Sequence, residues 1–217
     1  MALPISGIVL HGQNTSPNVA AGTSNQPISQ DQAGSVIASE FFPRYAQLVL
    51  QGDVFATNFA AAALAAPSAT ATGAFFLFNP ANSGKNLILL DSQVALTTWT
   101  LVTTTSVAIG IIPVANQTPT TTGAGAAISN TLVGSGNASV AKTYASGTLV
   151  GAPVLAMRVI ADFLLATAVG ASVLAIKDEI AGAIIIPPGS GIEIQGVSGT
   201  EADVTAIVGL TWAELPV

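Results

Sequence analysis

The fold class is decided by the stretch Ile184–Gly196, which reads IIIPPGSGIEIQG. Three isoleucines run into Pro187–Gly189, and a proline pair followed by glycine ends any regular element. Beyond this stop, isoleucines alternate with Glu193 and Gln195. Alternation of apolar and polar residues is the pattern of a half-buried strand. The stretch therefore predicts two core strands on either side of a tight turn.

The same pattern of short apolar runs and turn residues continues in both directions along the chain. Strands are predicted at Tyr45–Phe59, Phe75–Phe78, Leu87–Leu96, Thr97–Ile112, Val154–Ile160, Phe163–Ala166 and Val204–Trp212. Loops or turns are predicted at 82–85, 117–125 and 134–137, which are rich in Gly, Pro, Asn and Thr. Several short strands at this spacing predict an all-β sandwich or barrel. Residues 59–66 and parts of 163–176 could form helix instead.

The composition limits what kind of protein this can be. The chain has 217 residues, which is one large domain or two small ones, and only 7% of them are charged, against about 25% on average. Five basic residues against eleven acidic ones disfavour a nucleic-acid surface, so no nucleic-acid partner is expected. The absence of cysteine excludes disulfides and thiolate metal sites.

High hydropathy raises the question of a membrane protein. The longest apolar run, Phe163–Ile176, lies between Asp162 and Lys177 and has 14 residues, whereas a spanning helix needs about 20. Residues 1–12 have no basic segment ahead of their apolar residues, so no signal peptide is predicted. We expect no membrane partner. A neutral, weakly charged surface is poorly protected against association, which suggests that partners cover it.

Residues 1–40 differ in character from the rest of the chain. They are rich in Asn, Gln, Ser and Gly, carry charge only at Asp31 and Glu40, and show no persistent period. We predict an extended N-terminal arm over residues 1–40 and a β-sandwich domain over residues 41–217.

No motif predicts a catalytic, cofactor or metal site. Ser83-Gly84-Lys85 lacks the remaining residues of a phosphate-binding loop, since Asn79 and Asn86 occupy the positions of its first glycine and its final Ser or Thr. The glycine pairs at 123 and 125 and at 134 and 136 lack the third glycine of a dinucleotide fingerprint. We therefore interpret these glycines as turn and loop residues.

The remaining candidates for chemistry are few. His11 is the only histidine and lies in the predicted arm. A carboxylate pair or an oxygen cage for calcium is conceivable among the acidic residues toward the C-terminal side, but solvated loop charges are the simpler interpretation. These acidic residues are Asp178, Glu179, Glu193, Glu201 and Asp203. The aromatic residues that could form a sugar-stacking platform are Tyr45, Trp99, Tyr144 and Trp212, although scattered aromatics are usually core or interface anchors.

Two parts of the chain carry a resemblance to a known group of proteins. They are Phe75–Leu87, FFLFNPANSGKNL, and the C-terminal region formed by Ile184–Gly196, Val204–Leu210 and Thr211–Glu214. The order of apolar runs and turn residues in these parts resembles that in the sequences of bacteriophage virion structural proteins, in particular jelly-roll capsid-associated proteins of the decoration, cement or minor capsid kind. The resemblance implies a jelly-roll-like antiparallel β-sandwich and supplies no catalytic residue.

The resemblance also implies where the protein acts and with what. It would assemble in the host cytoplasm and reside on the capsid surface of the virion, as a homo-oligomer, expected to be a trimer, in contact with the major capsid protein or other virion subunits. We expect no enzyme activity and no cofactor. A receptor- or carbohydrate-binding virion module of the fibre or adhesin type is the alternative. The sequence does not separate a major capsid protein from a cement, vertex or tail component.

Overall fold

The computed structural model describes most of the chain beyond the predicted arm. The described residues are 44–64, 72–73, 75–101, 105–115, 121–148, 156–165, 168–171, 175–197 and 204–217. Contacts group Ala46–Val217 into one unit. The predicted arm, residues 1–40, lies outside the described residues, as do His11, Glu201 and Asp203.

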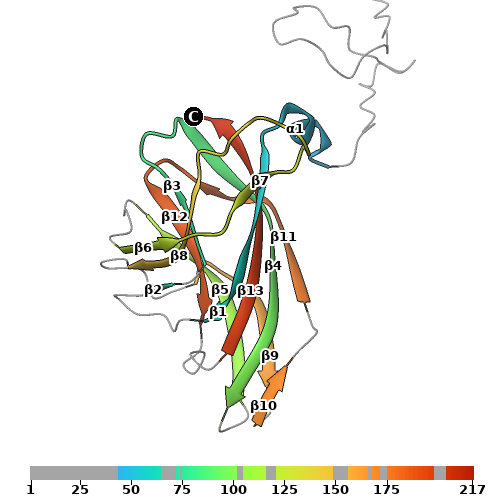
Figure 1. The fold of residues 1–217 in the computed structure, drawn as a ribbon, viewed down its shortest axis with the longest axis vertical. Coiled ribbons are helices and arrows are strands. Elements are labelled where there is room, and N and C mark those ends of the chain that lie inside the picture. The colour runs from blue at the N-terminus through green and yellow to red at the C-terminus, as the bar shows by residue number, and fades with distance from the viewer. Residues whose placement is uncertain are drawn as a thin grey trace, which may run out of the picture. The chain divides into compact units, whose positions relative to one another are not determined.

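The described residues are almost entirely β-structure, as the spacing of short apolar runs predicts (Figure 1). One short helix, α1 (Ala46–Gln51), precedes the strands. The strands are β1 (Val54–Ala63), β2 (Thr72–Gly73), β3 (Phe76–Asn79), β4 (Lys85–Leu101), β5 (Thr105–Val114), β6 (Thr121–Ala124), β7 (Ile128–Asn130), β8 (Lys142–Thr148), β9 (Arg158–Leu165), β10 (Ala168–Ala171), β11 (Ala175–Ile186), β12 (Ser190–Gly196) and β13 (Val204–Pro216).

The strands form two antiparallel sheets with jelly-roll connectivity. In the first, the order is β10-β4-β13-β1-β7, and β11 also pairs with β4; in the second, it is β2-β8-β3-β12-β5-β9, and β6 also pairs with β8. Taken in chain order, the principal strands are β1, β3, β4, β5, β9, β11, β12 and β13. The first of these pairs with the last, and the series passes between the sheets as in the paired Greek keys of a jelly roll. The predicted jelly-roll-like sandwich is confirmed.

An insertion between β5 and β9 extends both sheets on the same side. Its strand β8 pairs with β3 of the second sheet, and its strand β7 pairs with β1 of the first. We refer to residues 121–148, which hold β6, β7 and β8, as the insert. Thr121–Ala124 is a strand rather than part of the loop predicted at 117–125, because it pairs with β8, which is distant in sequence.

The core lies between the two sheets and is built from the inward side chains of both. Phe55 and Trp212 stack at 6.3 Å, and Phe59 meets Phe75 edge to face at 5.7 Å. Each fully buried large apolar side chain contributes about 1.5–3 kcal/mol. The alternation in β1 and β13 places these side chains on the faces that meet.

A smaller apolar cluster lies on the second sheet, apart from the main core. It contains Phe76, Phe78 and Val114, with Tyr144 packed against it. Strand β12 is consequently buried along its whole length. The prediction that this strand is half-buried is therefore wrong, because β12 is a central strand flanked by β3 and β5 and its polar face is covered as well.

The chain before β1 also differs from the prediction. Strand was predicted from Tyr45, but Ala46–Gln51 is helical and strand begins only at Val54. Gly52, at φ 76°, ends the helix, and its N–H donates to the Val49 carbonyl at 2.9 Å. No helix in the described part of the chain is long and apolar enough to cross a membrane.

The two alternatives left open by the sequence are settled for the residues described. Phe59–Ala63 continues β1, and residues 163–165, 168–171 and 175–176 belong to β9, β10 and β11. These alanine-rich segments are strands because they pair with neighbours across a sheet, as Ala62 does with Ala206. Pairing of this kind outweighs the helix propensity of alanine.

Candidate functional site

Ser83-Gly84-Lys85 is a structural turn between β3 and β4. The Ser83 N–H donates to the Pro80 carbonyl at 3.0 Å, and Gly84 has a φ of 67°. The Lys85 ammonium lies 3.3 Å from a carboxylate oxygen of Glu214. The lysine is thus already paired inside the protein, and no phosphate-binding loop is formed.

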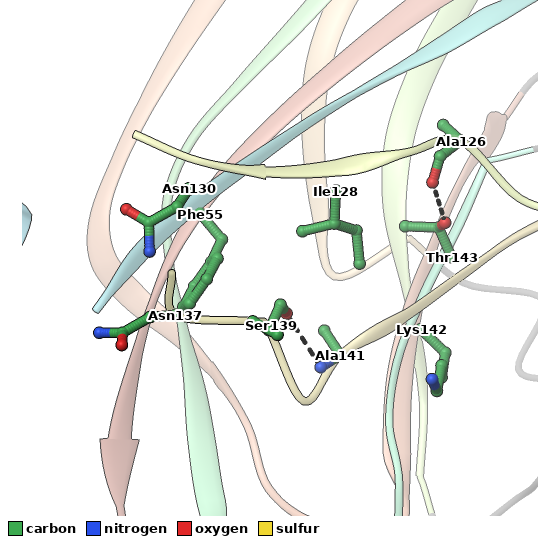
Figure 2. A pocket seen from close by; sticks show the side chains of 10 residues that line it. Phe55, Ala126, Ile128, Asn130, Asn137, Ser139, Ala141, Lys142 and Thr143 are labelled. Atoms are coloured by element: carbon green, nitrogen blue, oxygen red, sulfur yellow. Dashed lines mark hydrogen bonds between the residues drawn. The ribbon is translucent and has the colours of Figure 1, made fainter. Parts of the chain in front are cut away.

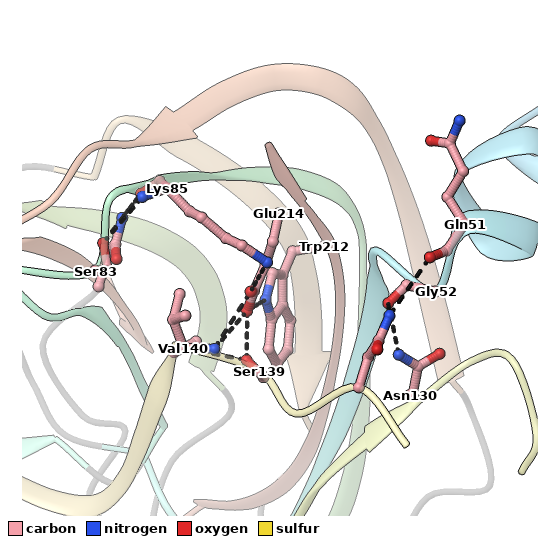
Figure 3. Close-up of polar contacts among 12 residues, drawn as sticks. Gln51, Gly52, Ser83, Lys85, Asn130, Ser139, Val140, Trp212 and Glu214 are labelled. Atoms are coloured by element: carbon pink, nitrogen blue, oxygen red, sulfur yellow. Dashed lines mark hydrogen bonds and ion pairs between the residues drawn. The ribbon is translucent and has the colours of Figure 1, made fainter. Parts of the chain in front are cut away.

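Glu214 is the centre of a network that fastens the insert to the C-terminal strand (Figure 3). Its side chain is fully buried and accepts hydrogen bonds from the Ser139 hydroxyl, the Val140 N–H at 3.1 Å and the indole N–H of Trp212 at 3.3 Å. With Lys85 as its ion-pair partner, the carboxylate is well satisfied. A carboxylate so fully engaged serves structure, because it has little capacity left for substrate.

The acidic residues considered from the sequence do not gather into a site. Asp178 on β11 is bound by the guanidinium of Arg158, whereas Glu193 lies on β12 of the other sheet. The residues that the structure describes hold no group of three His, Cys, Asp or Glu side chains that could bind a metal. A metal cage built from three such side chains is therefore not assembled within them.

Glu193 stands apart because it is buried without partners. The register places Phe76 of β3 on one side of it and Ile112 of β5 on the other. Neither of its carboxylate oxygens has a hydrogen-bond partner, and the same is true of the amide of Gln195, on the same face of the strand. Burial raises the pKa of Glu193 from 4.5 to about 7. The Gln195 amide makes no hydrogen bond of normal geometry to the carboxyl group, but its nearby dipole favours the charged form and so opposes this shift. The alternating pattern of this strand predicts an exposed Glu193, so its burial was not expected.

The aromatic residues do not form a sugar-stacking platform. Trp212 is fully buried in the core. Tyr144 packs against Phe76 and Phe78, with ring centroids 6.0 and 6.5 Å away, and Trp99 packs against the main core. Their rings are thus used in packing, which is the structural role expected of scattered aromatics.

A cavity of about 310 Å³ lies between β1 and the insert (Figure 2). Several of the polar side chains that line it bind other groups of the protein. Asn130 donates to the Gly52 carbonyl at 2.7 Å, and Thr143 donates to the Ala126 carbonyl at 2.6 Å. Asn130 and Thr143 therefore help to hold the insert in place.

The glycine pairs considered as nucleotide-binding motifs belong to the insert. Gly123 lies in β6, and Gly134, at φ 86°, lies in a turn after β7. Neither pair stands between a strand and a helix, so the structure supports the interpretation of these glycines as turn and loop residues.

A second cavity, of about 330 Å³, has an entirely different lining. It lies where the last residues of β5 and β11 and the first residues of β12 meet. We call it the edge groove; its lining is Pro113–Ala115, Met157, Ala183–Pro187 and Ser190–Ile192. Ser190 supplies the one polar side chain among these residues, and none of them is charged.

The edge groove opens onto exposed apolar side chains. Met157 is 48% exposed and Ile185 is 56% exposed, and Val159, two residues beyond Met157, is 57% exposed. Clustered exposed apolar side chains are typical of interaction surfaces in soluble proteins. Sequence reasoning missed this feature, because its walls come from three regions far apart in the chain: Pro113–Ala115, Met157 and the two arms of the β11–β12 turn.

The described part of the chain thus contains a fully engaged polar network and an uncharged groove, and it holds no group of three His, Cys, Asp or Glu side chains that could bind a metal. Comparison of the chain with protein-family models, with curated proteins and with solved structures found no match.

Proposed function

We propose that this protein is a non-enzymatic structural protein of a bacteriophage virion. It acts as a capsid decoration, cement or minor capsid protein on the capsid surface, and its jelly-roll bodies assemble into a symmetric homo-oligomer. Its partners are further copies of itself and the major capsid protein or other virion subunits.

The observation that carries the proposal is the contrast between the engaged polar groups and the exposed apolar ones. Lys85, Glu214 and Asn130 are all bound within the protein. Met157 and Ile185, by contrast, remain exposed beside a groove without charge. A protein that works by packing against neighbours needs such a surface, since burying few charges avoids desolvation costs.

The jelly roll itself supports an assembly role in a more general way. Jelly rolls recur in viral capsid proteins, and they also occur in proteins of other functions. The connectivity of β1 to β13 and the sparse charge, 7% of residues, together favour close packing of many copies.

The solution mass of the full-length chain tests the proposal. Light scattering after size exclusion, at several protein concentrations, is expected to give a discrete multiple of 21.6 kDa that persists on dilution. A monomer at every concentration would overturn self-assembly. The same measurement on a chain lacking residues 1–40 tests whether the predicted arm contributes to assembly. We expect this chain to form an oligomer of fewer copies, with a circular dichroism spectrum that still shows the folded sandwich.

A further inference from the structure

The edge groove borders the free edge of β11, which is poorly suited to strand addition. Within the described residues, β11 pairs only with β4 and so has a free edge. Pro113 and Pro187, which lack a backbone N–H, stand in the groove lining. A bulge interrupts β11 at Ala181 and Gly182, whose φ values are 58° and 86°. Prolines and bulges block edge pairing, so an occupant would be held mainly by its apolar side chains.

The chain itself contains a segment whose chemistry matches the groove. Residues 3–10, LPISGIVL, carry five aliphatic side chains and no charge. The first charged residue of the whole sequence is Asp31. A charged segment would lose its hydration in a lining that offers no charged partner, whereas an aliphatic segment gains about 25 cal/mol for each Å² that it buries.

The length of chain between this segment and the sandwich permits contact with a second molecule. Residues 11–43 separate Leu10 from the first described residue, Arg44. A fully extended chain of about 33 residues spans at most about 120 Å, and a random coil of that length spans about 30 Å. A domain of the size of Ala46–Val217 has a radius of gyration of only about 16 Å. The segment can therefore reach beyond its own sandwich.

We propose that the edge groove of one copy receives the aliphatic segment Leu3–Leu10 of a neighbouring copy. This inference rests on the proposed assembly function and deepens it, because it names both sides of the contact. The groove supplies the exposed walls Met157 and Ile185. The segment supplies Ile8, Val9 and Leu10 as its apolar anchor.

Cysteine trapping in this cysteine-free chain tests the contact directly. One full-length chain carries Leu10→Cys, and a second, differently tagged chain carries Ile185→Cys. The two are mixed under mild oxidation and separated on a non-reducing gel. We expect a disulfide-linked pair holding both tags, formed at least about tenfold faster than with Val133→Cys. Val133 is the matched control because it is 96% exposed and lies in the insert, outside the groove.

A single chain carrying both Leu10→Cys and Ile185→Cys separates the two possible sources of the segment. A crosslink formed at the mass of one chain would overturn docking between copies, because the segment would then occupy its own groove. Equal trapping at Val133 and Ile185 would overturn the groove as the specific site. If the chain is a multimer by mass but no disulfide forms, the inference is overturned and the assembly proposal is unaffected. If the chain is a monomer at every concentration, the assembly proposal itself is overturned.

Charge substitutions give an independent measure of the same contact. Leu10→Asp and Ile185→Asp should each raise the dissociation constant of the oligomer at least about tenfold, as expected for an apolar anchor at an interface. Because both changes remove one contact, the double variant should lose much less than the product of the two effects. The proposed pairing would be contradicted if the dissociation constant of the double variant rose by the full product of the two single effects. It would also be contradicted if Leu10→Asp left the dissociation constant unchanged.

Discussion

The guanidinium of Arg158 on β9 donates two hydrogen bonds, of 2.6 and 2.8 Å, to the carboxylate of Asp178 on β11. Strand β9 ends the second sheet, and β11 borders the first. The pair therefore joins two sheets at the edge of the sandwich, where the strand order provides no backbone pairing between them. Bidentate geometry makes such a pair more effective than an ordinary surface ion pair.

This geometry predicts a measurable but modest coupling between the two residues. Arg158→Ala and Asp178→Ala should each lower the free energy of unfolding, and a double-mutant cycle should give about 0.5–1 kcal/mol of coupling, since the arginine side chain is 39% exposed. Arg158→Lys is the matched control, because lysine keeps the charge but cannot form the fork. Urea unfolding measures the free energy of unfolding of the four proteins of the cycle and of Arg158→Lys, and a coupling near zero would contradict a role for the pair in closing the edge.

The network around Glu214 predicts a definite order of effects among three variants. Glu214→Ala should lower the free energy of unfolding by about 3 kcal/mol, because it leaves the buried N–H donors of Val140 and Trp212 without an acceptor. Ser139→Ala should cost about 1 kcal/mol through one lost hydrogen bond. Lys85→Met should cost least, since its side chain is 29% exposed.

Urea unfolding gives these free energies, and hydrogen exchange at the Val140 amide reports the attachment of the insert. Faster exchange at this amide is expected in Glu214→Ala. If Lys85→Met destabilised the protein as much as Glu214→Ala, the ion pair rather than the hydrogen-bond network would hold the insert.

Two glycines of the insert predict opposite outcomes for the same substitution. A Cβ added at Gly125 would lie 1.9 Å from the backbone carbonyl oxygen of Thr143, so the backbone of β8 would have to move. A Cβ at Gly136 meets nothing within 4 Å. Gly125→Ala should therefore lower the unfolding free energy by more than about 2 kcal/mol, and Gly136→Ala by less than about 0.5. Similar unfolding midpoints in urea would contradict the close approach of Gly125 to Thr143 on β8.

The sequence predicted strands well where turn residues and the alternation of apolar and polar residues mark their ends and faces. Pro187–Gly189 separates β11 from β12, and the alternation after it correctly predicted β12. The six-residue helix α1 was missed because its segment alternates well enough to resemble a strand, and its end depends on the left-handed conformation of Gly52. In a segment of only six residues, the strand period of two residues and the helix period of 3.6 residues cannot be told apart.

Features that depend on distant pairing could not be predicted from the sequence. The insert adds to both sheets through pairings with β1 and β3, and no local signal encodes those partners. The burial of Glu193 likewise follows from its place on a central strand between Ile112 and Phe76. The edge groove needs three regions that are far apart in the chain, so it exists only once the jelly roll has formed.

The buried carboxyl of Glu193 predicts how stability depends on pH. Its pKa is about 7 in the folded protein, against an ordinary value of 4.5, because burial disfavours the charged form. Below pH 4.5 both states hold the proton, so the group does not alter stability. Between pH 4.5 and 7 the unfolded chain has released a proton that the folded protein keeps, and the free energy of unfolding contributed by this group falls as pH rises. The total loss is about 3 kcal/mol, complete above pH 7.

Replacing Glu193 by glutamine isolates this contribution from the other carboxyl groups. Glu193→Gln keeps the shape of the side chain but cannot ionise, so it should be more stable than the wild type at pH 8 and should lack the decline between pH 4.5 and 7. Urea unfolding across pH 4–8 measures the difference between the two proteins, with Glu179→Gln, an exposed position on β11, as the control that keeps the decline. If the unfolding free energies of the wild type and Glu193→Gln changed with pH in parallel, the carboxyl group of the folded protein would titrate like an exposed one. That result would contradict the burial of Glu193 between Phe76 and Ile112.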